Sequence, residues 1–288
     1  MGVSQEQATI GDPTVKRASK SDAEDGREVL LETRGLVKRF RRGAELITAV
    51  EGLDLRINRG EFVCIIGPSG CGKSTLLNMT AGLMNPSEGE IRYRGEAVPE
   101  PNTQVGYITQ RDNLMPWRTV AGNVGLGLEI QGVPRSERQE RLQAMVDLVG
   151  LTGFEEAYPT QLSGGMRKRA SLARTLVLDP ETILADEPFG ALDAQLKMMM
   201  QGELLRIWGK STGRTVIFIT HDLSEAITLA DRVIVLTRRP GRVKVDCPVD
   251  IPRPRDVMKI RFTERFGKLH EQLWDALGED MAKGEDAL

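Results

Sequence analysis

The sequence predicts an α/β fold, in which buried strands alternate with helices. The first sign is a set of short apolar runs, Phe62–Ile66, Thr182–Ala185 and Thr215–Thr220, each of a length that suits one buried strand. The second is that polar or glycine-rich segments follow these runs directly. The third is a stretch of helical periodicity at about residues 112–165, which predicts a helical insertion. With 288 residues, 40% of them hydrophobic, the chain has enough apolar side chains for a real core.

Residues 1–27 are predicted to form a disordered tail, since they are rich in Ser, Asp, Glu, Lys and Gly and contain no aromatic residue. We interpret them as a solvated leader rather than a regulatory segment. Order is expected to begin near Val29. The alternating segments Leu36–Phe40 and Leu53–Ile57 predict half-buried strands. Phe40 is interpreted either as a core residue or as a ring that stacks on an adenine.

A glycine-rich loop connects the strand Phe62–Ile66 to a helix expected from Leu76. The loop consists of Gly67, Pro68, Ser69, Gly70, Cys71, Gly72, Lys73, Ser74 and Thr75. This arrangement is the phosphate-binding loop of P-loop NTPases. The glycines let backbone N–H groups converge on one anion, Lys73 adds positive charge for the β- and γ-phosphates, and the Ser74 hydroxyl is placed to bind Mg²⁺.

Cys71 belongs to this loop and lies near the start of a helix. The pKa of a thiol tends to fall at a helix N-terminus. We therefore expect Cys71 to be alkylated in the free protein and shielded by a bound nucleotide.

The character of the sequence changes after Gln110, which ends an expected strand. An apolar, proline-containing loop, Leu114–Trp117, comes first. Helical patterns follow at Val120–Ile130 and Ser136–Val149, with Ser136 as the candidate N-cap. We interpret the loop either as a docking surface for a partner or as packing inside the helical insertion.

A second pair of glycines stands at a helix start, in Ser163, Gly164 and Gly165, and a basic helical segment follows at 167–174. Because free N–H groups at a helix N-terminus attract anions, this is a second anion-binding geometry.

Polar residues follow two buried strands at the expected ligand edge of the sheet. Asp186 and Glu187 come directly after Thr182–Ala185, and His221 comes directly after Thr215–Thr220. Asp186 is positioned to hold Mg²⁺ through its waters, and Glu187 is positioned to polarise an attacking water.

The C-terminal part begins after Val233–Leu236, the last strand that we predict. A helix is predicted after Pro254, in an extension over residues 251–288 that we expect to pack on its own domain. Its apolar residues fall near one face at helical spacing, namely Val257, Ile260, Phe266, Leu269, Leu273 and Leu277.

Composition narrows the class of protein. The 39 basic and 41 acidic residues give a net charge of −2, so no general field attracts nucleic acid and none is expected as a partner. Three cysteines without framework spacing favour a reducing compartment. No apolar run approaches the roughly 20 residues of a membrane helix, and no apolar signal segment begins the chain. We expect a cytoplasmic protein that relies on another chain for any work at a membrane.

In this order the segments closely resemble an ATP-binding-cassette (ABC) ATPase subunit, over residues 29 to about 240. The match comprises Gly67–Thr75 (Walker A), Gln110 (Q-loop), Leu162–Met166 (signature), Ile183–Glu187 (Walker B), Ala191–Asp193 (D-loop) and His221 (H-loop). The resemblance implies a P-loop NTPase (RecA-like) core sheet with an antiparallel β subdomain and an inserted helical subdomain. Together these form an ATPase domain over residues 28–250.

The resemblance also implies a mechanism of ATP hydrolysis. Two copies pack head to tail around two ATP molecules, so that Ser163 and Gly165 of one copy cap the γ-phosphate held by Lys73 of the other. The other implied roles are general base for Glu187, alignment of the γ-phosphate and base for His221, contact with Mg²⁺ for Gln110, and a bridge between the copies for Asp193.

Two positions depart from the family pattern. The signature ends in Met166 where most members have Gln, but Ser163 and the backbone N–H groups are intact, so activity is expected. Phe40 replaces a Tyr, and in this family context its ring is expected to touch the adenine.

The family context also implies partners. Because no membrane span is fused to the ATPase, separate permease subunits in the membrane are implied, as in bacterial importers. An extracytoplasmic solute-binding protein acts indirectly, and the ATPase lies at the cytoplasmic face of the membrane. Three segments resemble the nitrate, sulfonate and taurine importer ATPases and so imply a small anionic solute: Asp186–Gln195, Arg238–Val243 and Ile251–Arg255.

Two alternatives stay open. Related subunits serve other small solutes, such as aromatic carboxylates or pyrimidine precursors, and solute choice belongs to the permease and the binding protein. The other alternative is an ABC protein that acts on DNA or ribosomes. Such proteins usually carry two cassettes or a long coiled coil, whereas this chain has one cassette and no heptad run.

Overall fold

The computed structural model describes residues 27–210 and 213–282. Of the predicted N-terminal tail, all but Arg27 lies outside these described residues. The strands are β1 (Val29–Arg42), β2 (Glu45–Asn58), β3 (Phe62–Ile66), β4 (Glu88–Tyr93), β5 (Glu96–Ala97), β6 (Val105–Ile108), β7 (Thr182–Asp186), β8 (Thr215–Ile219), β9 (Arg232–Leu236) and β10 (Val243–Pro248). The α-helices are α1 (Lys73–Thr80), α2 (Val120–Val124), α3 (Leu126–Ile130), α4 (Arg135–Leu148), α5 (Gly164–Leu176), α6 (Ala194–Lys210), α7 (Leu223–Leu229) and α8 (Glu264–Ala282).

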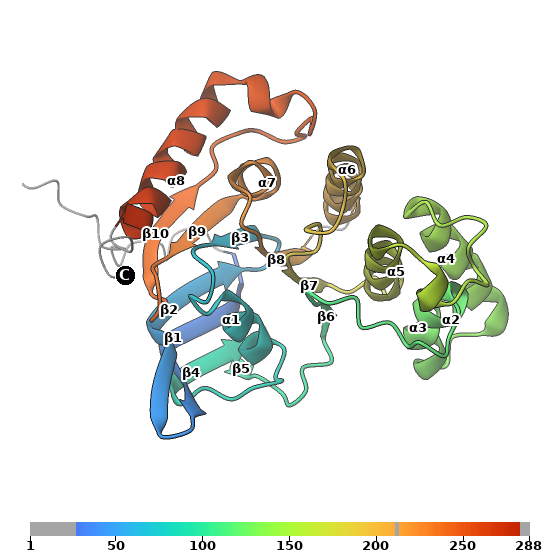
Figure 1. The fold of residues 1–288 in the computed structure, drawn as a ribbon, viewed down its shortest axis with the longest axis horizontal. Coiled ribbons are helices and arrows are strands. Elements are labelled where there is room, and N and C mark those ends of the chain that lie inside the picture. Colours follow the sequence, from blue (N-terminus) through green and yellow to red (C-terminus); the bar gives the residue numbers. More distant parts are fainter. Residues whose placement is uncertain (1–26, 211–212, 283–288) are drawn as a thin grey trace, which may run out of the picture.

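The strands form two sheets (Figure 1). The larger has the order β10-β9-β3-β8-β7-β6 and is parallel except for β10, which pairs antiparallel with β9. The smaller is antiparallel, with the order β2-β1-β4-β5. The predicted α/β class, with a parallel core sheet and an antiparallel subdomain, is confirmed. One further strand, β10, was not predicted and follows Val233–Leu236 at the sheet edge.

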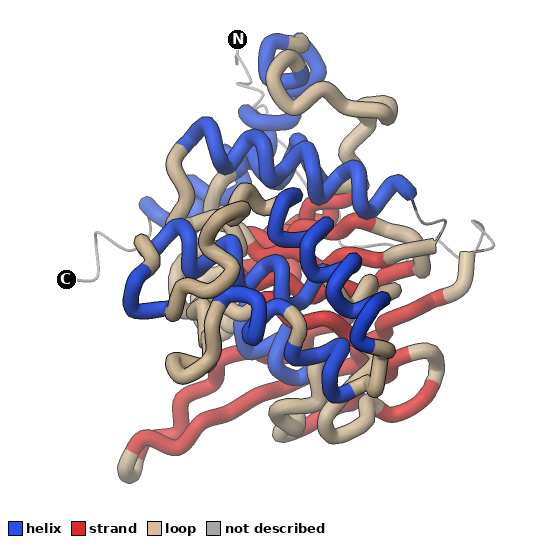
Figure 2. Tube along the Cα trace, turned by 90° about the vertical axis from the view of Figure 1, so that its right-hand side faces the viewer, coloured by secondary structure: helices blue, strands red, loops and turns tan. Residues whose placement is uncertain are grey.

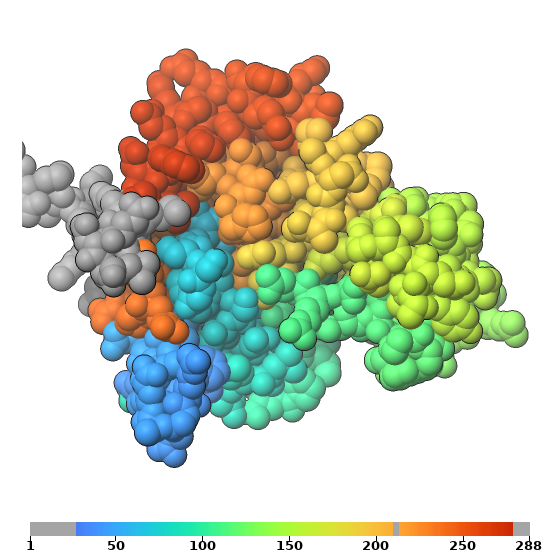
Figure 3. All heavy atoms as spheres, in the orientation of Figure 1, coloured from blue at the N-terminus to red at the C-terminus, as the bar shows by residue number. Residues whose placement is uncertain are grey.

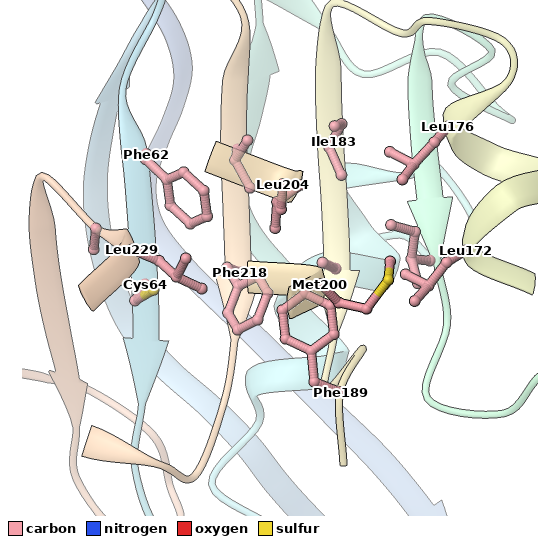
Figure 4. Packing of buried hydrophobic residues seen from close by; sticks show 14 of the residues in the cluster. Phe62, Cys64, Leu172, Leu176, Ile183, Phe189, Met200, Leu204, Phe218 and Leu229 are labelled. Atoms are coloured by element: carbon pink, nitrogen blue, oxygen red, sulfur yellow. The ribbon is translucent and has the colours of Figure 1, made fainter. Parts of the chain in front are cut away.

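Each central strand feeds two hydrophobic cores, because successive side chains point to opposite faces of the sheet. Phe62 and Phe218 face one core, where their ring centroids lie 6.0 Å apart, while Val63 and Ile217 face the other. Figure 4 shows Met200 of α6 packed against the first core. Figure 2 shows helices layered in front of the strands. Burial on both sides explains why the central strands read as unbroken apolar runs.

The insertion forms a separate lobe at the right of Figures 1 and 3, made of α2, α3 and α4 beside α5. The pattern at Val120–Ile130 is split into two short helices, which meet at Gly125. A Cβ on Gly125 would lie 3.1 Å from Cδ1 of Leu142, so α4 packs directly on this junction. Ser136 is not the N-cap of α4, because that helix begins one residue earlier, after Pro134.

The C-terminal extension packs on the rest of the domain. Phe266 and Leu273 of α8 are buried in the first core, whereas Val257 and Ile260 are buried before α8 begins. Arg255 ties this segment to the end of α7 by donating to the carbonyl oxygens of Ile227, Thr228 and Ala230 at 3.1, 3.2 and 2.6 Å. Burial, helped by nearby Arg253, lowers the pKa of Arg255 to about 10.

Among residues 27–210 and 213–282, none of the helices has both the length and the hydropathy needed to span a bilayer.

Candidate functional site

The glycine-rich loop lies between β3 and α1, as the sequence predicts, with Gly67 to Gly72 in the loop and Lys73, Ser74 and Thr75 opening α1. Gly72 shows why glycine is needed here. It has a φ of +99°, and a Cβ would lie 2.5 Å from Cγ2 of Val50 and 2.9 Å from the carbonyl oxygen of Ala49. The loop is therefore pressed against β2, which belongs to the antiparallel sheet.

The side chain of Lys73 folds back onto its own loop. Its ammonium group donates to the carbonyl oxygens of Gly67 at 2.7 Å and Pro68 at 3.0 Å, and it lies 3.8 Å from Sγ of Cys71. These contacts fix a positive charge at the mouth of the loop, and an anion held there gains a charge-assisted hydrogen bond.

Asp186 and Ser74 meet across the sheet edge. Asp186 ends β7 and is buried, which raises the pKa of its carboxyl group, while a hydrogen bond from Ser74 acts in the opposite direction. A hydroxyl and a carboxylate that already touch supply two oxygen atoms, the type of ligand that Mg²⁺ prefers. In the described part of the chain, no three His, Cys, Asp or Glu side chains are grouped to hold a metal, so any ion here would depend on the hydroxyl of Ser74 as well as on Asp186.

Glu187 brings the other two predicted polar residues together. Its Oε2 lies 3.4 Å from Nδ1 of His221 and accepts a hydrogen bond from Nε2 of Gln110 at 3.5 Å. The backbone of Glu187 has a φ of +46°, and its N–H donates to the carbonyl oxygen of Ile219 at 3.0 Å. The turn after β7 thus aims the carboxylate at the groups that end β6 and β8.

Lys168 supports this cluster, although no pattern in the sequence indicates this role. It lies in α5, is buried, and donates to the carbonyl oxygens of Thr109 at 2.8 Å and Gln110 at 2.9 Å. Burial lowers the pKa of Lys168, although the nearby carboxylate of Asp186 opposes that change. The basic helical segment after Gly165 thus holds the backbone at Gln110.

The second glycine segment lies away from the phosphate loop of the same chain. Ser163 is the N-cap of α5, and its hydroxyl accepts from the N–H of Met166 at 3.3 Å. A Cβ on Gly165 would lie 3.7 Å from the carbonyl oxygen of Ala191, so this segment is next to the turn that ends at Asp193. In the sheet, β8 and β7 stand between β3, which carries the phosphate loop, and β6, against which α5 packs.

Phe40 lies in β1, opposite Ile47 of β2, and is 36% exposed. The ring is therefore not a core residue, and the interpretation of Phe40 as part of the core is wrong. The ammonium group of Lys38 lies 5.5 Å from the ring centroid, a cation–π distance.

The expected reactivity of Cys71 is wrong. The residue has an exposed fraction of 0% and belongs to the second hydrophobic core. Burial raises the pKa of its thiol, and the charge of Lys73 offsets only part of that effect. Desolvation thus outweighs the helix start, because a thiolate in apolar surroundings loses its hydration.

We expect native Cys71 to resist a thiol reagent both with and without nucleotide. Labelling of all three cysteines should appear only after denaturation, since Cys64 and Cys247 are also buried. Mass spectrometry of the alkylated protein measures this. Rapid modification of Cys71 in the folded protein would contradict its placement.

The loop Leu114–Trp117 fits packing at one end and an exposed docking surface at the other. Leu114 packs partly against the first core, whereas the side chain of Trp117 is 72% exposed. The buried amide of Asn123 holds the backbone around it. Its Oδ1 accepts from the N–H of Met115 at 2.7 Å, and its Nδ2 donates to the carbonyl oxygens of Met115 and Arg118 at 3.1 and 3.0 Å. Trp117 therefore projects from a fixed loop.

Residues 50–190 match a protein family described as ABC transporter. Among curated proteins, the chain is 47% identical over 251 residues to an uncharacterised ABC transporter ATP-binding protein of Methanocaldococcus jannaschii, covering 87% of this chain and 94% of the relative. A taurine import ATP-binding protein of Rhizobium johnstonii is 43% identical over 231 residues, or 79% of this chain and 88% of the relative. A nitrate import ATP-binding protein of Synechocystis is 43% identical over 215 residues, or 75% and 80%.

Solved structures give the same picture of the fold. A dimeric bacterial ABC transporter cassette is similar with a TM-score of 0.72 and 32% identity, covering 77% of this chain and all of that chain. A dimeric post-hydrolysis state of an ATP-binding cassette bound to ADP and phosphate has a TM-score of 0.70 and 31% identity over the same shares.

Proposed function

Because the chain belongs to the family of ABC transporter ATP-binding proteins, we propose that it is the ATP-hydrolysing motor subunit of an importer for a small anionic solute. The solute class follows the relatives, which are named as taurine, nitrate and aliphatic sulfonate import proteins. In this proposal residues 28–250 form the ATPase domain, the helical subdomain spans about 112–165, and 251–288 form a C-terminal extension.

The observation that carries the enzymatic part is the convergence of three polar groups on one sheet edge. The phosphate loop with Lys73 follows β3, while Asp186, which pairs with Ser74, and Glu187 stand at the end of β7, two strands along in the same parallel sheet. Ligands of open parallel sheets bind at this edge. A triphosphate held by Lys73 lies beside a carboxylate that can accept a proton from water.

The residues divide the work of phosphoanhydride hydrolysis. Backbone N–H groups of the loop and Lys73 hold and neutralise the β- and γ-phosphates. Glu187 accepts the proton of the attacking water, His221 keeps that carboxylate in line, and Gln110 restrains it by donating to the same oxygen, Oε2. Such a base contributes about 10²–10⁴-fold, and positioning and charge stabilisation supply most of the rest.

Ser74 and Asp186 would hold Mg²⁺, because their oxygen atoms suit a hard cation that also binds phosphate, and Gln110 is proposed to contact the same ion. When bound, this ion neutralises charge on the β- and γ-phosphates. Phe40 is proposed to stack on the adenine, because its exposed ring stands on the hairpin against which the phosphate loop packs.

The separation of the two glycine segments supports a homodimer. The chain carries the phosphate loop on β3 and the Ser163, Gly164 and Gly165 segment beside α5, with two strands between β3 and β6. We infer that the second segment, together with Asp193, completes the site of the other copy. The dimeric state of the similar cassettes agrees with this arrangement.

The exposed Trp117 is proposed to dock on a permease in the membrane, next to Gln110. None of the helices in the described residues could span a bilayer, so transport would need such a partner. The extracytoplasmic binding protein would act through the permease, and the ATPase would sit at the cytoplasmic face of the membrane.

Replacing Trp117 with Asp is expected to abolish assembly with the permease and solute uptake while leaving ATP binding unchanged. The substitution removes an apolar docking group, but the loop backbone stays held by Asn123. The test measures MgATP hydrolysis of the purified chain, its co-purification with permease-containing membranes, and uptake.

Trp274→Asp is the matched control, because Trp274 is also exposed, at 61%, but lies on α8, away from the helical lobe (Figure 1). It is expected to assemble and transport normally. Normal uptake by the Trp117 variant would exclude this docking surface, and absence of MgATP hydrolysis by the wild-type chain would remove the proposed function itself.

A further inference from the structure

Lys197 joins two segments of the site that are distant in sequence. It lies in the first turn of α6, and its backbone N–H donates to the carbonyl oxygen of Asp193 at 2.8 Å. Its ammonium group lies 2.9 Å from Oδ2 of Asp222 and 2.8 Å from Oε1 of Glu225. Asp222 directly follows His221 in the chain. One residue therefore contacts the Asp193 turn with its backbone and the His221 segment with its side chain.

The two carboxylates that receive Lys197 also shape the backbone around His221. Glu225 is 5% exposed and accepts a hydrogen bond from the hydroxyl of Thr220, the residue before His221. The N–H of Asp222 donates to the same hydroxyl oxygen at 3.0 Å, and Oδ1 of Asp222 caps α7. The residues on both sides of His221 thus belong to one polar cluster, to which Lys197 supplies a positive charge.

The polar cluster around His221 is held in place by helix α6 and by a buried carboxylate. α6 is anchored by Met200, which is buried in the first core (Figure 4), so the helix that carries Lys197 cannot shift freely. A buried carboxylate such as Glu225 is costly without a cation, which favours a fixed position for the ammonium group. The Asp193 turn and residues 220–222 are therefore joined through one residue, Lys197, whose position is held by the fold.

We propose that Lys197 is a positioning residue, through which contact of Asp193 with the second copy sets the orientation of His221. The path runs from the carbonyl of Asp193 through Lys197 to Asp222, and from His221 to Oε2 of Glu187 at 3.4 Å. This inference rests on the proposed function, because it makes hydrolysis in one copy depend on closure with the other. Nucleotide binding at Lys73 does not take part in it.

The first test compares Lys197→Met and Lys197→Arg in the full chain. Lys197→Met should lower kcat about tenfold to a hundredfold, the size of effect expected from a small misplacement of a reacting group. The dissociation constant for MgATP should stay within about twofold, because the phosphate loop is unchanged. Arg should restore most of kcat, since its guanidinium can reach both carboxylates. Equal loss of binding and turnover, or no rescue by Arg, would overturn the positioning role.

The second test does not depend on turnover. The chain has two histidines, so the imidazole resonances of His221 and His270 serve as reporter and internal control in NMR spectra. Asp193→Ala should shift the His221 signal in the wild-type background and leave it unmoved when Lys197→Met is also present. The His270 signal should stay in place throughout. A His221 shift of equal size in both backgrounds would overturn the inference even if the wild-type chain hydrolyses ATP.

A paired variant guards against simple misfolding. Lys197→Met with Glu225→Gln removes both charges, so no carboxylate of Glu225 stays buried without its cation. This variant should melt near the wild-type temperature and still show the loss of kcat. Its His221 resonance should also stay unmoved when Asp193→Ala is added. Wild-type kcat in this folded variant would overturn the inference. An inactive wild-type chain that still relays the Asp193→Ala shift would instead count against the proposed function alone.

Discussion

Replacing Glu187 with Gln is expected to slow ATP hydrolysis by about 10²–10⁴-fold, because the amide cannot accept a proton from water. Nucleotide binding should be retained, since the variant leaves Lys73 and Ser74 in place. The protein should then accumulate as a dimer with ATP between the copies. Phosphate release measures the first effect, and gel filtration with ATP measures the second.

The control for this variant is Glu137→Gln. Glu137 is an exposed carboxylate on α4 that pairs with Arg141 one turn away, at 3.4 Å. Loss of such a pair changes stability by only a few tenths of a kcal/mol, so turnover should be unaffected. If the Glu187 variant turned over at the normal rate, another group would have to be the base.

Replacing Gly241 with Ala is expected to weaken nucleotide binding about tenfold to a hundredfold. A Cβ on Gly241 would lie 1.9 Å from the carbonyl oxygen of Cys71, inside the phosphate loop. Gly241 cannot easily retreat, because its N–H donates to the carbonyl oxygen of Ala49 at 2.9 Å and its own carbonyl accepts from Glu51 at 3.1 Å. Overpacking of this kind costs about 1–3 kcal/mol, which the loop would absorb by moving.

The affinity of the Gly241 variant for a nucleotide is measured by titration, and circular dichroism reports whether the fold is kept. Gly267→Ala is the matched control, because a Cβ on that α8 residue would meet nothing within 4 Å. It should bind nucleotide like the wild type and gain slightly in stability. Unchanged affinity in the Gly241 variant would show that the loop tolerates the contact.

The sequence predicted the elements whose identity depends on neighbours in the chain. The runs of β3, β7 and β8 are apolar because both faces of the parallel sheet are covered, and the glycine loop is recognisable from its spacing alone. β10 carries alternate apolar residues, Val243, Val245 and Cys247, but it was not predicted, because its pairing with β9 at the sheet edge is not visible in the sequence.

Several residues that shape the site have partners far away in the sequence, and no local pattern reveals them. Lys168 binds carbonyl oxygens 58 and 59 residues earlier, and Gly241, which lies between β9 and β10, leaves no room for a Cβ beside the carbonyl oxygen of Cys71 after β3. For Cys71 the local rule of the helix start pointed to a reactive thiol, whereas burial by the surrounding core decided the outcome. Burial depends on tertiary packing, which spacing along the chain does not disclose.

Asn123 holds the backbone of the Trp117 loop by hydrogen bonds, so the conformation of the loop does not depend on the side chain of Trp117. Shape and chemistry of this surface are thus specified by different residues. Under the proposed docking, a substitution at position 117 would change the surface that meets the membrane partner and leave the loop backbone in place.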